Sequence, residues 1–485
     1  MNIEIKKREY FKKFNTLETL KYISIKNREK YIEQALKIKN NEKDVSYDLE
    51  NIPFLNTRIA YNVIKYSNDF RGTKELNREK LKEIYYEIME KFSYKSTSNL
   101  TQEEEILKIT IGHSQEQFWR QQLFDILPYA NLRNKRIMSY YNLVKPINDI
   151  LTEELGIEID SIIYENGLDV LSFIFLKNNI YSENELKQIV LEYIEKKKIN
   201  IKLEQVMAIL EYYTCDYEWV RTKLEKDRPF FIKPFIKTQD TKKYIIIDIY
   251  SFTWKYSEGI YWIIRNYYNN IQSNEFVNSF GSMFEKYLEG VFTFLLKRNQ
   301  FENLDLNKNK RKERIADWLV KTQKYNLIIE QKSILLLSSF KVMEINIEEF
   351  KKKFIPKIEK AFFQLENTEK IKIQNNKKTI KFILLFEYFP ILESLKLYFE
   401  SILEKRIFDL ENYLFITLDE FEILMTLLKN DEELFNLVLK ERLEREKELF
   451  KGAKFFDIFE KYKIFKNEYI QHLNNEYKNI KNLKA

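Results

Sequence analysis

An apolar strand that also carries two charges places the strongest constraint on what this chain can fold into. Leu327, Ile328 and Ile329 run directly into Glu330, and Lys332 follows two residues later. A near-continuous apolar run of this kind is typical of a strand covered on both faces. It therefore predicts a sheet sandwiched between helices. Side chains two residues apart point the same way along a strand, so Glu330 and Lys332 are expected on one face.

Charged groups in a buried strand need a chemical reason to be there. A carboxylate in such a strand must be paired, hydrogen-bonded or bound to a metal. Asp317 poses the same problem in the segment RIADWLV, where Ile315, Asp317 and Leu319 are expected to share one strand face. Hard cations such as Mg²⁺ or Mn²⁺ are held by carboxylate oxygens together with waters and substrate phosphates. Asp317 and Glu330 are therefore candidate metal ligands.

The spacing of these residues resembles the PD-(D/E)XK nuclease superfamily. Asp317 is followed one short strand later by Glu330, Gln331 and Lys332, although Ala316 stands where the motif has its proline. The resemblance implies that Asp317 and Glu330 bind a divalent metal and that the backbone carbonyl of Gln331 is a further ligand. It also implies that Lys332 orients the attacking water or stabilises developing charge.

Two residues outside the motif are implicated by the same resemblance. Glu285 lies in GSMFEKYLEGVF, which matches the helix that precedes the motif and adds an acidic residue to the catalytic and metal-binding set. Gln364 lies near the end of the helix predicted after the motif, and the resemblance makes it an accessory site residue. The implied core is an αβββαβ arrangement with a mixed sheet, called restriction-endonuclease-like.

The segments that follow the motif are patterned as such a core requires. Residues 345–365 are predicted to be helical, with Pro356 either kinking the helix or starting a second one. An apolar stripe at helical spacing is expected there, formed by Phe350, Phe354, Ile358, Phe362 and Leu365. The runs at 379–386 and 412–417 are predicted to be buried strands, and Thr417 with Glu420 is predicted to cap the next helix.

The remainder of the chain favours helices. Only eight glycines and seven prolines occur in 485 residues, and this scarcity indicates long helices with few tight turns. We therefore predict an α+β protein that is mainly α, with a helical N-terminal half, the nuclease-like core and a helical C-terminal tail.

Four regions are expected along the chain. They are a helical recognition or regulatory region at 1–225, a hairpin and helix junction at 226–274, the nuclease-like domain at 275–430 and a helical extension at 431–485. The hairpin is predicted within RPFFIKPFIKTQDTKKYIIIDIY, where two β-rich runs flank a polar turn. In the first region, Ser182 and Glu185 form a predicted capping pair, as do Thr101 and Glu104.

Several classes of site are excluded by composition. One cysteine and two histidines rule out a disulfide within the chain and a cysteine-based zinc cluster, and nearly rule out a histidine-ligated zinc site. No run reaches the eighteen apolar residues that a membrane span needs, and the N-terminus lacks the apolar core of a signal peptide. A soluble, cytoplasmic protein is expected.

Basic residues gather beside the motif although the net charge is only +7. Taken alone, a charge run is more often a solvated loop or helix face. Next to a metal site, however, such groups would neutralise phosphates. Lysines at 351–353, 357 and 360 follow the Glu330 strand. The predicted nucleic-acid-binding residues are Lys308, Lys310, Arg311, Lys312 and Arg314.

The leading hypothesis is a Mg²⁺-dependent endonuclease that cuts DNA. A nuclease must be kept off the genome of its own cell, so restriction or antiphage defence is expected, with control by a regulatory protein partner or another trigger. A homo-oligomer is left open. RNA is an alternative substrate, because phosphate and metal contacts do not report the 2′-OH. The alternative of another class is a non-catalytic scaffold or nucleic-acid-binding protein in which the charges form a buried ion-pair network.

Overall fold

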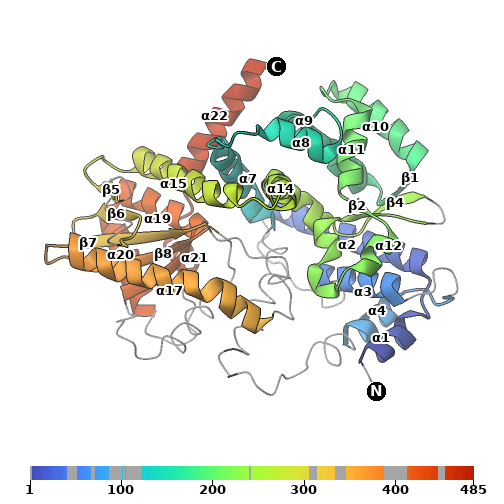
Figure 1. Cartoon of the computed structure of the whole chain (residues 1–485), viewed down its shortest axis with the longest axis horizontal. Coiled ribbons are helices and arrows are strands. Elements are labelled where there is room, and N and C mark those ends of the chain that lie inside the picture. The colour runs from blue at the N-terminus through green and yellow to red at the C-terminus, as the bar shows by residue number, and fades with distance from the viewer. Residues whose placement is uncertain are drawn as a thin grey trace. The chain divides into compact units, whose positions relative to one another are not determined.

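The computed structural model describes most of the chain, and helices dominate it (Figure 1). The residues described are 3–40, 52–66, 72–86, 101, 104, 123–239, 242–304, 314–333, 346–386, 412–445 and 454–484. Two small mixed sheets accompany the helices. The coarse prediction of a mainly α, α+β protein is thereby confirmed. Among the described residues, no helix combines the length and the apolar character needed to cross a membrane.

The chain divides into two compact units. The N-terminal unit comprises residues 1–98, 116–131 and 142–276, and the C-terminal unit comprises 277–485 together with 132–141 and the stretch around Thr101 and Glu104. Thr101 and Glu104 exchange the two hydrogen bonds of a capping box, as the sequence predicts. The sequence assigned 99–141 to the helical N-terminal region, whereas part of that stretch belongs to the unit that contains the motif.

The N-terminal unit is built from helices around a four-stranded sheet. Its described helices are α1 (Ile3–Phe11), α2 (Thr16–Lys39), α3 (Pro53–Tyr66), α4 (Arg78–Tyr86), α8 (Ile147–Leu155), α9 (Ser161–Lys177), α10 (Glu183–Lys197), α11 (Leu203–Tyr212), α12 (Tyr217–Thr222), α13 (Pro229–Ile232) and α14 (Ile249–Asn270). The helix α7 (Leu123–Met138) precedes α8 in the chain. The predicted capping box of Ser182 and Glu185 starts α10.

The sheet of this unit contains the predicted hairpin at its centre. Its strand order is β1-β4-β3-β2, with β1 at Ile180–Ser182, β2 at Thr214–Cys215, β3 at Phe235–Lys237 and β4 at Lys243–Ile246. β3 and β4 pair antiparallel, which confirms the hairpin. Because its strands also pair with β1 and β2, the hairpin is an internal part of the N-terminal unit.

The C-terminal unit contains a five-stranded sheet in chain order, β5-β6-β7-β8-β9. The strands are β5 (Phe301–Asn303), β6 (Trp318–Lys321), β7 (Tyr325–Lys332), β8 (Lys378–Leu385) and β9 (Tyr413–Thr417). β5, β6 and β7 pair antiparallel, and β7, β8 and β9 pair parallel. β8 and β9 confirm the two strands predicted at 379–386 and 412–417.

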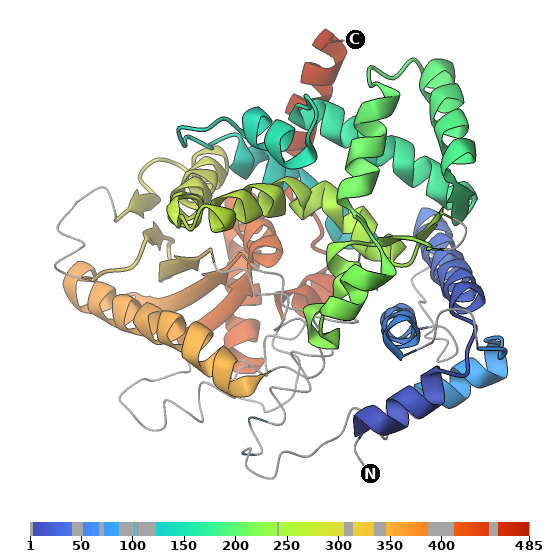
Figure 2. The ribbon, with the colours of Figure 1, turned by 45° about the vertical axis from the view of Figure 1, so that its right-hand side comes forward.

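Helices cover both faces of this sheet (Figures 1 and 2). The described helices of this unit are α15 (Glu275–Leu295), α17 (Ile347–Lys372), α19 (Leu418–Asn430), α20 (Glu432–Arg445), α21 (Phe455–Tyr462) and α22 (Glu468–Lys484), and α22 packs against α19. Thr417 and Glu420 form the predicted capping box at the start of α19. α17 runs through Pro356 as one continuous helix, so Pro356 does not start a second helix.

The sheet core explains why these sequences form these layers. On one face, Leu319, Ile328 and Ile383 pack in a single buried cluster with Ile358 and Phe362 of α17. The predicted apolar stripe of α17 is thus buried against the sheet, and we call this side the α17 face. The opposite face carries Trp318, whose ring lies 4.9 Å from that of Phe292 in α15. Both faces are apolar, as the uninterrupted hydrophobic run in β7 predicts.

Candidate active site

Asp317 lies directly before β6, which begins at Trp318. The sequence predicted it within that strand. Its backbone N–H donates to the Ile329 carbonyl at 3.1 Å, and its carbonyl accepts from the Leu304 N–H at 2.9 Å. These bonds continue the hydrogen-bond ladder on both sides, so the backbone at Asp317 is held between β7 and the residue that follows β5. Asp317 is 8% exposed. A carboxylate oxygen, Oδ2, accepts a hydrogen bond from the Gln331 N–H at 2.8 Å.

Glu330 and Lys332 meet on one face of β7, as the alternation of the strand predicts. Lys332 Nζ lies 2.6 Å from Glu330 Oε1. Glu330 is 3% exposed, and the Lys332 side chain is 12% exposed. An ion pair at this depth is screened little by solvent, so it holds both side chains firmly.

The strand register places these three side chains together. Trp318 is paired with Ile329, so Asp317 comes next to Glu330 across the β6–β7 ladder. Leu319 and Ile328 are likewise paired and belong to the cluster on the α17 face. By alternation along both strands, Asp317, Glu330 and Lys332 therefore project on the α17 face. The two carboxylates and the ammonium converge there.

Gln331 contributes its backbone to this face and its side chain to the other. Its N–H is the donor to Asp317. Its side-chain oxygen accepts from the indole Nε1–H of Trp318 at 3.0 Å, which anchors the residue on the opposite side of the sheet. The peptide between Glu330 and Lys332 is therefore held from both sides.

Side chains of α17 form hydrogen bonds with the backbone directly before Asp317. Gln364 Nε2 donates to the Ile315 carbonyl at 3.0 Å. Thr368 Oγ1 accepts from the Ala316 N–H at 2.6 Å and donates to the Gln364 carbonyl at 2.7 Å. Thr368 and Ala316 are completely buried. Gln364, the predicted accessory residue, thus supports the segment that carries Asp317, and Thr368 is a supporting residue that the sequence did not reveal.

Glu285 lies in α15 and takes a different partner. Its Oε1 accepts from Asn303 Nδ2 at 2.9 Å. Asn303 is paired with Trp318 across β5 and β6, so alternation puts Asn303 on the face opposite Asp317. Within the described part of the chain, no three histidine, cysteine, aspartate or glutamate side chains form a metal-holding group. The structure brings Asp317, Glu330 and Lys332 together and leaves Glu285 outside that group.

Most of the predicted basic patch lies outside the described residues. Lys308, Lys310, Arg311 and Lys312 belong to the segment 305–313, which is not described. Arg314 is described and exposed, and its φ of 51° is in the left-handed region. It lies three residues before Asp317, directly before the two residues whose backbone is hydrogen-bonded to α17.

A second cluster of charged residues lies on the α17 face, at β8, the strand next to β7. Lys381 of β8, which is 6% exposed, forms ion pairs with Glu366 and, at 2.7 Å, with Glu369 of α17. Burial alone would raise the pKa of Glu366, but hydrogen bonds from Lys381 and Tyr413 lower it overall. Sequence reasoning missed this cluster. Lys381 in the apolar run TIKFILLF carried the same signal as Glu330, namely a charge in a buried strand.

The donor set on the α17 face suits a hard divalent cation. Two buried carboxylates and the Gln331 peptide supply oxygen ligands of the kind that Mg²⁺ and Mn²⁺ prefer, and such ions keep several waters or substrate oxygens. Burying two carboxylates beside a single ammonium leaves one excess negative charge among these three groups, which a bound cation would offset.

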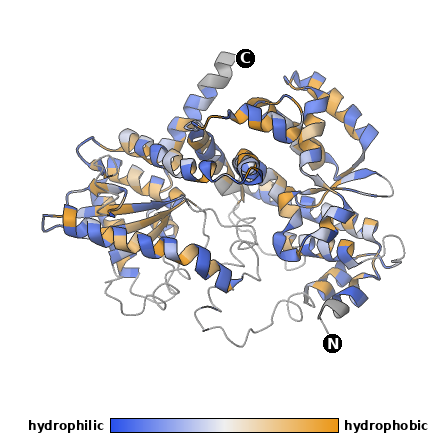
Figure 3. Cartoon of the chain, viewed as in Figure 1, coloured by the Kyte–Doolittle hydropathy of each residue, from blue (hydrophilic) through white to orange (hydrophobic). Residues whose placement is uncertain are grey.

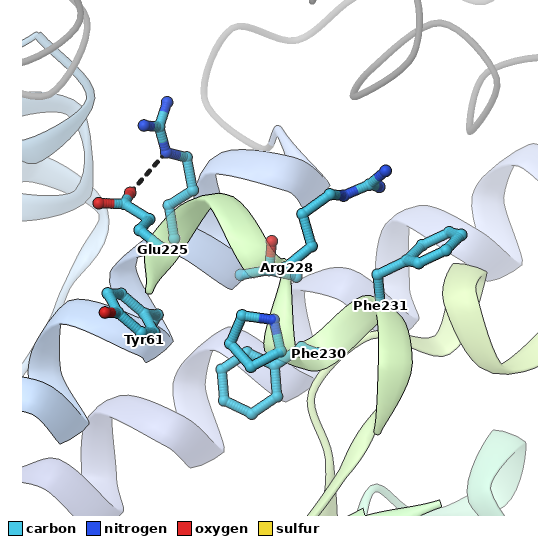
Figure 4. Close-up of a pocket in the computed structure, with 8 residues that line it drawn as sticks. Tyr61, Glu225, Arg228, Phe230 and Phe231 are labelled. Atoms are coloured by element: carbon cyan, nitrogen blue, oxygen red, sulfur yellow. Dashed lines mark hydrogen bonds and ion pairs between the residues drawn. The ribbon is translucent and has the colours of Figure 1, made fainter. Parts of the chain in front are cut away.

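A separate polar site lies in the N-terminal unit, in a small hollow (Figure 4). The hollow is lined by Thr57, Arg58, Tyr61, Glu225, Arg228, Pro229, Phe230 and Phe231. Glu225 accepts from Arg58 Nε at 2.6 Å and from Lys7 Nζ at 2.9 Å. Burial opposes ionisation, but the two cations prevail and lower the pKa of Glu225 to about 2. We interpret this ion-pair cluster as a structural link between α1, α3 and the segment before α13.

Comparison with known proteins adds no relative to this picture. No protein-family model, no curated protein and no solved structure matches the chain. What the site can do is therefore inferred from its own geometry.

Proposed function

We propose that the chain is a metal-dependent phosphodiesterase that hydrolyses nucleic acid, with DNA as the leading substrate. The observation that carries this proposal is the convergence of Asp317, Glu330 and Lys332 on one face of the sheet. Asp317 is fixed by the Gln331 N–H at 2.8 Å and Glu330 by Lys332 at 2.6 Å. Two acids and a lysine held on one face of a sheet are the groups that such a reaction requires.

The order of elements supports the same proposal. Among the described elements, helix α15, strands β5, β6 and β7, helix α17 and strand β8 occur in this order along the chain. This is the αβββαβ order that the PD-(D/E)XK resemblance implies, with the acid before β6 and the Glu-Gln-Lys sequence at the end of β7. The sheet is mixed, as that resemblance also implies.

Each of the converging residues has a role in this proposal. Asp317, Glu330 and the Gln331 carbonyl would hold Mg²⁺ or Mn²⁺, whereas Glu285 has no role in this set because its Oε1 accepts from Asn303 on the other face of the sheet. A metal bound there polarises the scissile phosphate and lowers the pKa of a water molecule. Lys332 holds its positive charge beside Glu330, where it orients a water or stabilises the charge that develops on the phosphate.

The burial of the site supports control by a trigger or a partner. Asp317 and Glu330 are 8% and 3% exposed, so a nucleic-acid phosphate has to gain access before it can reach them. A nuclease that is closed until a signal arrives would suit restriction or antiphage defence, where the genome of the host must be spared. A regulatory protein or a second copy of the chain would supply such a signal.

One observation favours a second candidate, a non-catalytic protein with a buried ion-pair network. Lys332 and Glu330 already form an ion pair with each other, and Asp317 accepts from a backbone N–H. In that case the three charges would stabilise the sheet, and their removal would lower stability without any change in catalysis.

The decisive experiment compares wild type with Lys332→Ala on supercoiled DNA, linear DNA and RNA, each in Mg²⁺, Mn²⁺ or EDTA. We expect wild type to cut in the presence of metal and the variant to lose at least a hundredfold in rate. Lys321→Ala is a matched control, because Lys321 lies in β6 of the same sheet and forms an exposed ion pair with Glu302 at 3.6 Å. Equal cleavage by all three proteins would refute the assigned role of Lys332, and cleavage of RNA alone would change the substrate.

A further inference from the structure

The outer side of α17 carries a row of lysines. Lys352, Lys360 and Lys370 are all exposed, and we call these three residues the lysine stripe. Lys352 and Lys370 are eighteen positions apart, which is five full helical turns, so they lie on the same side of the helix. Lys360 stands between them within about 80° of that direction. At a rise of 1.5 Å per residue the stripe is about 27 Å long.

The three lysines of the stripe outnumber the glutamates that share their exposed side of α17. Of the five glutamates in α17, Glu348 is exposed, and the partly exposed Glu359 lies within about 20° of the direction of Lys352. Glu366 and Glu369 are turned toward the sheet, where Lys381 pairs with both. Lys351 is turned toward Glu104 and Glu348 and does not join the stripe. Hydrophilic residues recur along the length of α17 in Figure 3.

The position of α17 relates the lysine stripe to the candidate active site. The buried side of the helix packs on the α17 face, and Gln364 and Thr368 contact the two residues before Asp317. Figures 1 and 2 show α17 lying along the sheet of the C-terminal unit. A ligand that rests on the stripe would therefore lie against the helix that covers the proposed metal site.

We propose that the lysine stripe binds the phosphate backbone of a nucleic-acid duplex. Lysine is a point charge suited to phosphate, and a row of exposed lysines recognises the backbone without reading sequence. A duplex rises about 3.4 Å per base pair, so the stripe spans about eight base pairs. Over that length a duplex stays nearly straight because its persistence length is about 150 base pairs, so it can lie along α17. This inference rests on the proposed function only in taking nucleic acid as the ligand.

The test measures binding of a 20-base-pair fluorescent DNA duplex in EDTA, so that no cleavage interferes. The variant is the triple substitution Lys352→Gln, Lys360→Gln and Lys370→Gln, and affinity is measured across a series of salt concentrations. The slope of log K against log salt is expected to become shallower by about 2.7, because each lost phosphate contact contributes about 0.9. The control removes the same charge from exposed lysines of the N-terminal unit, with Lys196, Lys197 and Lys226 all changed to glutamine.

The outcomes separate this inference from the proposed function. The stripe is overturned as a binding surface if the stripe variant has the same salt slope as wild type. It is also overturned if the control variant loses as much of the slope as the stripe variant. Preferential binding of single strands overturns the duplex assignment. Parallel duplex RNA and duplex DNA measurements identify which backbone is preferred. If wild type shows the stripe-dependent slope yet never cuts with Mg²⁺ or Mn²⁺, the stripe stands and the nuclease proposal fails.

Discussion

Replacing Thr368 with valine should weaken the C-terminal unit by an amount that the contacts of Thr368 define. The hydroxyl accepts the Ala316 N–H at 2.6 Å, and both residues are completely buried. Valine has nearly the same shape but no acceptor, so the Ala316 N–H would be left buried and unpaired. An unsatisfied buried donor costs about 1–3 kcal/mol. We expect a loss of about 2 kcal/mol in the free energy of unfolding, measured by urea denaturation.

A matched hydroxyl deletion provides the control. Thr214 is buried in the N-terminal unit, and its hydroxyl donates to the Leu210 carbonyl at 2.7 Å. That carbonyl also accepts from the Tyr213 N–H, so Thr214→Val leaves no acceptor unpaired. Its cost should be about 0.5–1 kcal/mol. Thr368→Ser, which restores the hydroxyl, should recover most of the loss caused by Thr368→Val.

The same variant tests whether Thr368 positions Asp317. The bonds to Ile315 and Ala316 hold the backbone directly before Asp317, so Thr368→Val should also lower the affinity for Mn²⁺, whereas Thr214→Val should not. The reasoning is refuted if Thr368→Val costs no more than Thr214→Val, or if it destabilises the protein while Mn²⁺ affinity stays at the wild-type value.

Two further predictions concern buried ion pairs. The folded-state pKa of Glu225 is depressed to about 2, so its contribution to stability is present above the unfolded-state pKa and is lost as the pH falls from about 4.5 toward 2. Glu225→Gln should therefore cost roughly 3 kcal/mol at pH 7 and much less at pH 3 in urea titrations, and an equal cost at both values would contradict the assignment. In the C-terminal unit, Arg133 donates to both oxygens of the completely buried Glu422, at 2.9 and 2.8 Å. Arg133→Met should cost about 3–5 kcal/mol in the same assay because it leaves that carboxylate without its cation, and a loss under 1 kcal/mol would show that the pair contributes little.

Features that depend on local pattern could be predicted from the sequence. The apolar run before Glu330 predicts β7 as an inner strand, and the stripe from Phe350 to Leu365 predicts the buried side of α17. The capping boxes at Ser182 and Thr417 also depend on residues only three positions apart. Strong periodicity and short-range hydrogen bonds are visible in a single sequence.

Features that depend on distant partners could not be predicted. β1 and β2 have three and two residues, too few for alternation to show. The bond from Thr368 to Ala316 joins residues 52 positions apart, and Arg133 meets Glu422 across 289 positions. Nothing near Arg133 in the sequence indicates that its helix ends in the unit that carries Asp317. Asp317 was expected within a strand and lies one residue before β6 begins, because the alternation of side chains does not show where a strand starts.

The central claim is that Asp317 and Glu330 form a metal site, and calorimetric titration of Mn²⁺ into wild type and Asp317→Asn tests it most directly. Asparagine keeps an oxygen that can accept the Gln331 N–H, so the variant should fold with nearly wild-type stability while losing the negative charge that a cation needs. We predict that wild type binds Mn²⁺ and that the variant binds at least tenfold more weakly. Equal binding by both proteins, or no binding by wild type together with a large loss of stability in Asp317→Asn, would contradict the metal site and favour a structural ion-pair network.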